Sequence, residues 1–168
     1  MSAHALKSFR LWSLFGWLAC LGLLGYALYA QHQMFLDPCP LCILQRVAFM
    51  VMAVGFLLAA LFANRAWLRV LSVLIIALGA VAGMGVSGWH VYLQGLPADQ
   101  VPACGPGLNY MLQTLPLTDV LAKVFAGSGE CAKIDWSFLG LSMPAWTFVW
   151  YAGLLLGTAW MLRQAKRI

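Results

Sequence analysis

The chain has 168 residues, of which 63% are hydrophobic and only 9% are charged. In a soluble domain roughly a quarter of the residues are charged. A monomer of this size cannot hide so much apolar surface from water. The composition therefore excludes an ordinary soluble protein. The net charge of +5 does not indicate nucleic-acid binding, because no basic cluster with interleaved aromatic residues occurs. We expect one domain, residues 1–168, that resides in a lipid bilayer.

Four apolar stretches are long enough to cross a bilayer as helices, which requires about 20 residues each. They cover residues 11–30, 43–62, 70–89 and 144–162. Their hydrophobicity is continuous rather than alternating, which predicts helices. The first stretch follows basic residues as a signal peptide does, but it is too long for one and lacks a clean cleavage site. We expect it to stay as an anchor in an all-α membrane protein, a four-helix transmembrane bundle.

The charges between the spans predict the orientation of the bundle. Most basic residues lie on the two tails and the 63–69 loop: Lys7, Arg10, Arg65, Arg69, Arg163, Lys166 and Arg167. All acidic residues lie on the other side: Asp37, Asp99, Asp119, Glu130 and Asp135. Because basic segments stay in the cytoplasm, both termini are predicted to be cytoplasmic. The loops 31–42 and 90–143 are predicted to face outward.

The 90–143 loop is far longer than most connections, and loops of this length are usually functional or disordered. Its apolar residues recur at helical spacing over one short stretch: Leu117, Val120, Leu121, Val124 and Phe125. Polar residues between them make this stretch a short amphipathic helix. Such a helix either lies flat on the outer leaflet or packs on the end of the bundle, and the sequence favours neither.

The five cysteines divide by their position relative to the spans: Cys20, Cys39, Cys42, Cys104 and Cys131. Cys20 lies in the middle of the first span, where a free cysteine behaves as a small apolar residue, and we interpret it as a packing residue. The other four lie on the outer side, where disulfides persist. Four thiols on one face indicate a function for that face.

Cys39-Pro40-Leu41-Cys42 forms a Cys-x-x-Cys motif where the second span begins. Pro40 suits the first turn of a helix, and a helix N-terminus stabilises a thiolate. Arg46 lies four residues after Cys42 and so on the same helix face. An arginine just inside a span is a functional candidate, here for stabilising the thiolate and holding an anionic partner.

Two alternatives for this motif are a passive disulfide and half of a zinc site. A passive disulfide rarely uses so tight a ring beside a cation, and a zinc site needs four ligands, typically from a second close pair. Cys104 and Cys131 are 27 positions apart, and neither has a neighbouring cysteine or histidine. The motif therefore favours redox chemistry, and we expect no bound metal.

Cys104 and Cys131 have two readings of their own. Their spacing alone favours a disulfide that staples the long loop, which would contribute about 3 kcal/mol in the chain-entropy model. A reactive pair at the membrane surface, however, needs a route to soluble substrates, which a second exchanging pair supplies.

His90, at the outer end of the third span, either reaches a bound cofactor or is simply solvated. Gly79 and Gly83 indicate close helix packing.

Two stretches resemble the bacterial disulfide-bond formation protein B (DsbB) family. The segment Gln31-His32, Pro38-Cys39-Pro40-Leu41-Cys42-Ile43 and Arg46 resembles the first redox loop of that family. The segment Ser128-Gly129-Glu130-Cys131, then Trp136, Phe138-Leu139-Gly140-Leu141 and Met143-Pro144, resembles the approach to its last span. The resemblance covers nearly the whole chain, including four spans, inward termini and two outer loops that each carry a cysteine pair.

The resemblance implies a quinone-dependent protein-disulfide oxidoreductase in the bacterial inner membrane, with its long loop in the periplasm. It implies that Cys42 donates electrons to quinone from the Cys39–Cys42 pair, and that Arg46 stabilises its thiolate. Cys104 and Cys131 would form the pair that faces the partner, a DsbA-like thioredoxin-fold oxidase, with Cys104 forming the mixed disulfide. His90 aligns with a histidine that the family places near the quinone.

The implied cofactor is quinone, with ubiquinone favoured over menaquinone. Pro40 departs from the family, which carries an aliphatic residue there, and this affects the redox poise rather than the reaction. Two alternatives remain open from the sequence. One is a relative that serves a dedicated oxidase other than DsbA, and the other is a non-catalytic scaffold or metal-binding protein with structural disulfides.

Overall fold

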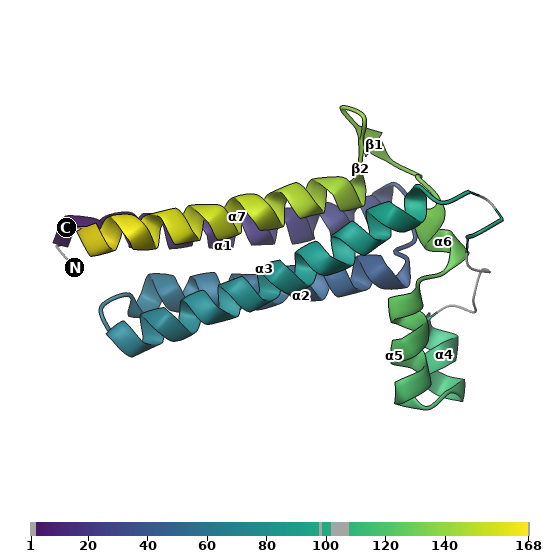
Figure 1. The fold of residues 1–168 in the computed structure, drawn as a ribbon, viewed down its shortest axis with the longest axis horizontal. Coiled ribbons are helices and arrows are strands. Elements are labelled where there is room, and N and C mark those ends of the chain that lie inside the picture. The colour runs from purple at the N-terminus through teal and green to yellow at the C-terminus, as the bar shows by residue number, and fades with distance from the viewer. Residues whose placement is uncertain (1–2, 98, 102–107, 168) are drawn as a thin grey trace.

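The computed structural model describes residues 3–97, 99–101 and 108–167 of the chain. Its elements in chain order are α1 (Ala3–Gln33), α2 (Pro40–Phe62), α3 (Ala66–Gln94), α4 (Leu108–Thr114), α5 (Leu117–Ala126), α6 (Gly129–Ala132), β1 (Ser137–Phe138), β2 (Leu141–Ser142) and α7 (Met143–Arg167). Among the described residues, four helices are long and apolar enough to cross a membrane, namely α1, α2, α3 and α7. They run alongside one another as a bundle (Figure 1). The predicted four-helix membrane fold is confirmed.

Each of these helices is longer than the apolar stretch that predicted it. Hydropathy marks the length buried in lipid, whereas the backbone hydrogen bonds of a helix continue until a residue interrupts them. The third helix ends only at Gly95, whose N–H bonds to the carbonyls of Leu93 and Tyr92. His90 therefore lies inside α3 rather than at its end.

The bundle core is made of interlocking apolar side chains from all four long helices. Cys20 of α1 is fully buried in this core together with Phe56 and Met52 of α2 and Ile76 of α3. Cys20 belongs to the packed core, which confirms its interpretation as a packing residue. Close approach of α1 and α2 depends on Gly16, where a Cβ would lie 2.6 Å from Phe56 Cε1.

The glycines of α3 allow two neighbouring helices to approach closely. A Cβ at Gly79 would lie 2.8 Å from Met52 Cγ of α2, and one at Gly83 would overlap the ring of Tyr151 of α7. Tyr151 is fully buried, and its ring stacks on Phe49 with centroids 4.1 Å apart. The packing role predicted for these two glycines is confirmed, and small residues at such contacts are typical of membrane helices.

Gly83→Ala should destabilise the bundle, whereas Gly85→Ala on the same helix should not. The Cβ of the first variant meets the Tyr151 ring, while nothing lies within 4 Å of a Cβ at Gly85. Overpacking of this kind costs about 1–3 kcal/mol. Thermal unfolding in detergent, followed by circular dichroism, should show a lower midpoint for Gly83→Ala alone. Equal midpoints for the two variants would contradict the packing described above.

The chain termini and the α2–α3 connection lie at one end of the bundle, and α4, α5, α6 and the hairpin lie at the other (Figure 1). The amphipathic helix predicted in the long loop is confirmed as α5. Its Val120 and Val124 are buried against Met111 of α4 and Leu44 of α2. Its other apolar side chains are exposed: Leu117, Leu121 and Phe125. This helix therefore packs through its valines on α4 and on the first turns of α2, and its contact with the leaflet remains a prediction.

A two-stranded hairpin, which the sequence did not lead us to expect, precedes α7. Ser137 pairs with Ser142 and Phe138 with Leu141. The two turn residues, Leu139 and Gly140, have φ values of 51° and 80°, as a tight hairpin turn requires. The indole N–H of Trp146 donates to the carbonyl of Phe138 at 3.0 Å, which ties the hairpin to the start of α7.

Candidate active site

The Cys-x-x-Cys motif forms the beginning of α2. Cys39 is the N-cap residue, its sulfur accepts a hydrogen bond from the Cys42 amide at 3.4 Å, and Pro40 occupies the first turn. Cys42 consequently lies in the first turn of a long helix, where free amides and the helix dipole favour negative charge on its sulfur. The sequence predicts this arrangement because each part of it is local.

Three sulfurs follow one another at this helix end. The Cys39 thiol donates to the Cys42 sulfur at 3.1 Å, and the thiol of Cys131 on α6 also interacts with Cys39. Cys39 and Cys131 are buried in one cluster, with Leu41 and Leu93. Cys39 is therefore the middle sulfur, in contact with both of the others.

The hydrogen bonds and the burial decide which sulfurs keep their protons. The bond from Cys131 lowers the pKa of Cys39, but the bond to Cys42 and burial outweigh it and raise that pKa to about 12. The bond to Cys39 and burial raise the pKa of Cys131. A thiol with a raised pKa is a donor and not an anion at neutral pH. The row thus runs from two protonated thiols to Cys42, the acceptor at its end.

His90 of α3 lies directly beside this row. Its Nε2 is 3.8 Å from the Cys39 sulfur, and its Nδ1 is 3.3 Å from the side-chain nitrogen of Gln45 on α2. Gln45 in turn lies 3.2 Å from the hydroxyl of Thr147 on α7, and that hydroxyl lies 3.0 Å from Ser87 on α3. His90 is buried, so the solvated alternative is wrong, and a polar chain across three helices holds its ring.

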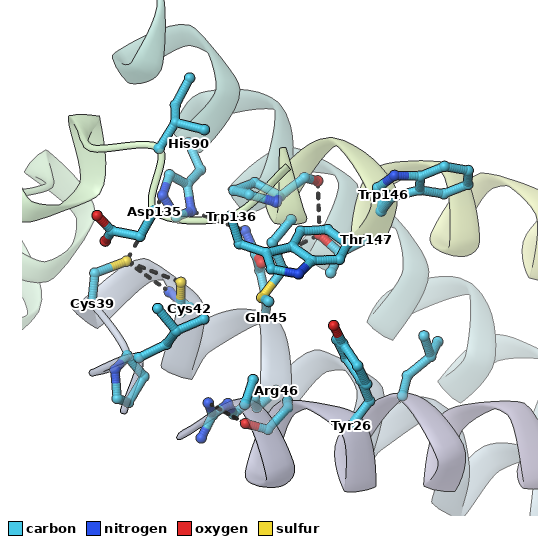
Figure 2. Close-up of a pocket in the computed structure, with 18 of the residues that line it drawn as sticks. Tyr26, Cys39, Cys42, Gln45, Arg46, His90, Asp135, Trp136, Trp146 and Thr147 are labelled. Atoms are coloured by element: carbon cyan, nitrogen blue, oxygen red, sulfur yellow. Dashed lines mark hydrogen bonds between the residues drawn. The ribbon is translucent and has the colours of Figure 1, made fainter. Parts of the chain in front are cut away.

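Arg46 points toward α1 rather than directly at the sulfurs (Figure 2). Its guanidinium donates to Gln31 Oε1 at 2.6 Å and to the carbonyl of Ala27 at 3.2 Å. Its positive charge acts on Cys42 through space. Gln31 therefore holds the arginine in place, and the positive charge of the guanidinium lies on the α1 side of the site.

A cavity of about 370 Å³ connects these groups, since Cys39, Cys42, Arg46 and His90 all line it. Figure 2 shows their side chains around this space, with Tyr26 of α1 and Trp146 of α7 on its other sides. Trp136 meets Tyr26 edge to face with ring centroids 6.1 Å apart. The walls are largely aromatic and apolar, with the polar groups gathered at the sulfur end, as is typical of small-molecule sites.

The structure brings together five of the six predicted site residues: Cys39, Cys42, Arg46, His90 and Cys131. The sixth, Cys104, lies outside the described residues. Sequence reasoning missed Gln45 and Thr147. Both are polar residues at span depth, and such residues are functional candidates by default, so this signal was present.

The chain is similar to proteins of one known family. The family model described as "Disulfide bond formation protein DsbB" matches residues 9–161. A disulfide bond formation protein B from Chromobacterium violaceum is 47% identical over 150 residues, 89% of this chain and 90% of that protein. One from Nitrosococcus oceani is 48% identical over 147 residues, 88% of this chain and 87% of that protein.

A third relative of the same name, from Xanthomonas euvesicatoria, is 46% identical over 162 residues, 95% of this chain and 94% of that protein. The matched residues contain α2 and α3 completely, most of α1 and α7, and every site residue described above. A match of this extent shows the family. The chain belongs to the DsbB family of disulfide bond formation proteins, multi-pass membrane proteins that act in thiol–disulfide chemistry.

Proposed function

We propose that this protein is a quinone-dependent disulfide oxidoreductase that reoxidises a DsbA-like periplasmic oxidase. The observation that carries the proposal is the row of sulfurs Cys131, Cys39 and Cys42, which ends at the cavity. Cys131 comes from the long outer loop, whereas Cys42 comes from a membrane helix. The row therefore connects the long outer loop with a cavity lined by the long helices. Cys131 is itself buried, so the partner would react at Cys104.

The cavity suits a quinone ring. Its volume of about 370 Å³ lies within the range for small-molecule sites, about 300–1,000 Å³. Tyr26, Trp136 and Trp146 provide flat apolar contacts, and Arg46 provides hydrogen-bond donors for a carbonyl oxygen. His90 lines the same cavity beside the Cys39 sulfur. When bound, the quinone accepts the two electrons that the Cys39–Cys42 dithiol gives up on closing to a disulfide. Arg46 then stabilises the negative charge that develops on the groups beside it, the Cys42 sulfur and the quinone oxygen.

The order of the sulfurs indicates how electrons enter. In the oxidised protein, Cys39 and Cys42 form a disulfide. When the partner's dithiol has opened the Cys104–Cys131 disulfide through a mixed disulfide with Cys104, the Cys131 thiolate attacks Cys39, the sulfur it contacts. The Cys131–Cys39 bond forms, the Cys39–Cys42 bond breaks, and Cys42 leaves as a thiolate, which its position in the first turn of α2 favours.

The cycle balances without any further reactant. The partner's two thiols become its disulfide, and their two electrons and two protons leave with the quinone as quinol. The partner's second thiol attacks the mixed disulfide, which closes the partner's own disulfide and releases Cys104 as a thiolate. Cys104 then attacks Cys131, and the Cys131–Cys39 bond breaks as the Cys104–Cys131 disulfide forms. The freed Cys39 would close to a disulfide with Cys42 as the two electrons pass to a bound quinone. Four cysteines thus return to their starting state in each turnover.

We place the sulfurs on the periplasmic face of the bacterial inner membrane, with both termini in the cytoplasm. The termini lie at the end of the bundle opposite α6 (Figure 1), the helix that carries Cys131. Basic residues gather at the same end of the bundle as the termini, and cytoplasmic segments of membrane proteins carry an excess of basic residues. An oxidising compartment on the other side would keep the cysteine pairs functional.

The test is a turnover assay with the full-length protein in detergent. Excess reduced DsbA and a soluble ubiquinone or menaquinone analogue are added, and loss of the quinone is followed by absorbance. Catalytic loss that requires both DsbA and the protein supports the proposal, and we expect the ubiquinone analogue to be used faster. If neither analogue is reduced with any thioredoxin-fold oxidase tried, the proposed function is wrong.

A further inference from the structure

The three groups at the start of α2 also form a metal-ligand set. The sulfurs of Cys39 and Cys42 and the Nε2 of His90 lie within 4.8 Å of one another. Thiolate sulfur and neutral imidazole nitrogen are the preferred ligands of Zn²⁺ and the related thiophilic cations. The sequence argued against a metal because it offers no second close pair of ligands beside Cys39 and Cys42. The packing of α3 on α2 supplies His90 as a third ligand, which a site with one open position requires.

We propose that the reduced protein binds one thiophilic divalent cation, Zn²⁺ or Cd²⁺, through Cys39, Cys42 and His90. The ion forms bonds to the two sulfurs and to the imidazole nitrogen, and the thiols release their protons to solvent. No electron is transferred. The Cys39–Cys42 disulfide has no thiolates to offer, so only the reduced site binds. The inference thus rests on the proposed cycling of this pair between dithiol and disulfide.

The distances suit a tetrahedral ion after a small adjustment. Zinc bonds of about 2.3 Å to sulfur and about 2.0 Å to nitrogen place two sulfurs about 3.8 Å apart, and a sulfur and a nitrogen about 3.5 Å apart. The Cys39 and Cys42 sulfurs are 3.1 Å apart, and Cys39 Sγ lies 3.8 Å from His90 Nε2. A rotation of the Cys42 side chain about χ1 would open the sulfur pair.

The surroundings of His90 support its role as a ligand. A metal-bound imidazole usually donates its other N–H to an acceptor that fixes the ring. Gln45 lies 3.3 Å from Nδ1, and the two ends of an amide are assigned from their partners. With its oxygen toward Nδ1, Gln45 accepts this proton, and its nitrogen donates to the Thr147 hydroxyl. That hydroxyl is free to accept because its own proton goes to the Pro144 carbonyl at 2.8 Å.

Burial favours the metal-bound state over the free dithiolate. Cys39 and His90 are buried and Cys42 is partly buried. Two adjacent thiolates in such a place would lose much of their hydration, whereas a divalent ion makes the cluster neutral. All three ligands line the cavity, which leaves space for a fourth, non-protein ligand, as in zinc sites with three protein ligands. A bound ion holds both sulfurs and so prevents them from closing to a disulfide.

The experiment measures binding directly, without quinone or partner. The full-length protein carrying Cys104→Ser and Cys131→Ser, so that only the proposed site keeps two outer thiols, is reduced and freed of reductant under anaerobic conditions. Cd²⁺ is added, and the ultraviolet sulfur-to-cadmium charge-transfer band is followed. We expect one Cd²⁺ per chain, displacement by Zn²⁺, and no band when the same protein carries the Cys39–Cys42 disulfide.

Two histidine variants in that background separate the proposed site from a bare dithiol. His90→Ala should weaken Cd²⁺ binding by at least about 10-fold, the lower range for loss of support at a metal site. His32→Ala, at an exposed position near the end of α1, should bind as the parent does. Circular dichroism checks that both keep their helices, and Cys42→Ser provides a second variant that should lose the band.

Equal Cd²⁺ affinity in the two histidine variants, or a band that persists in Cys42→Ser or in the oxidised protein, would overturn the proposal. The outcome is independent of the proposed function, because the titration contains neither quinone nor DsbA. Metal binding without turnover would contradict only the oxidoreductase proposal. Turnover without metal binding would contradict only the proposed metal site.

Discussion

Cys42→Ser should abolish quinone reduction, whatever reductant is supplied. Cys42 is the last sulfur of the row, lines the cavity and occupies the first turn of α2. Serine has no sulfur through which electrons can leave, and neighbouring groups cannot replace a missing nucleophile of this kind. Turnover with reduced DsbA and a ubiquinone analogue should fall by at least about 10³-fold, to the uncatalysed background.

Cys131→Ser provides the informative contrast. Turnover driven by DsbA should be lost, because no sulfur reaches Cys39 from the outer loop. Turnover driven by dithiothreitol should survive, because a small dithiol can attack the partly exposed Cys42 and open the Cys39–Cys42 disulfide directly. Equal loss with both reductants would contradict the order of the sulfurs.

Cys20→Ser is the matched control for both cysteine variants. It removes a thiol of the same chain that lies in the packed core, away from the sulfur row. Activity with either reductant should be unchanged in that variant. A large loss on changing Cys20 would show that activity reports on folding rather than on the exchange of electrons.

Arg46→Ala should lower kcat/KM for quinone by about 10²-fold or more while leaving exchange with DsbA nearly unchanged. Removing one donor that stabilises developing negative charge costs about 10²–10³-fold in rate. Arg46 is held by Gln31 and Ala27 of α1, so its charge is already positioned before any ligand binds. Arg46→Lys should recover part of the loss, since it keeps the charge but not the forked geometry.

The measurement varies quinone at saturating DsbA, and DsbA at saturating quinone. The control is Arg69→Ala, which removes an arginine bonded to the Ala63 carbonyl at the opposite end of the bundle. That variant should have normal kinetics for both substrates. Normal quinone kinetics in Arg46→Ala would remove the arginine from the site, and an equal fall in both substrates would indicate a structural role.

The sequence alone determined the parts of this protein that depend on local rules. The four spans follow from the length of the apolar stretches, since a bilayer imposes one length on any helix that crosses it. The amphipathic helix α5 follows from the spacing of Val120 and Val124. The start of α2 at Cys39-Pro40 follows because N-capping and a proline in the first turn act over only a few residues.

The tertiary structure decided which groups share the site. His90 is 51 positions from Cys39, and Thr147 is 102 positions from Gln45. Sequence periodicity reaches only one or two helical turns, so it says which face a residue occupies but not which helix meets that face. That choice belongs to side-chain packing, here to the close approach that Gly79 and Gly83 allow. Side-chain packing thus placed His90, for which the sequence left two interpretations open, beside the reactive sulfurs.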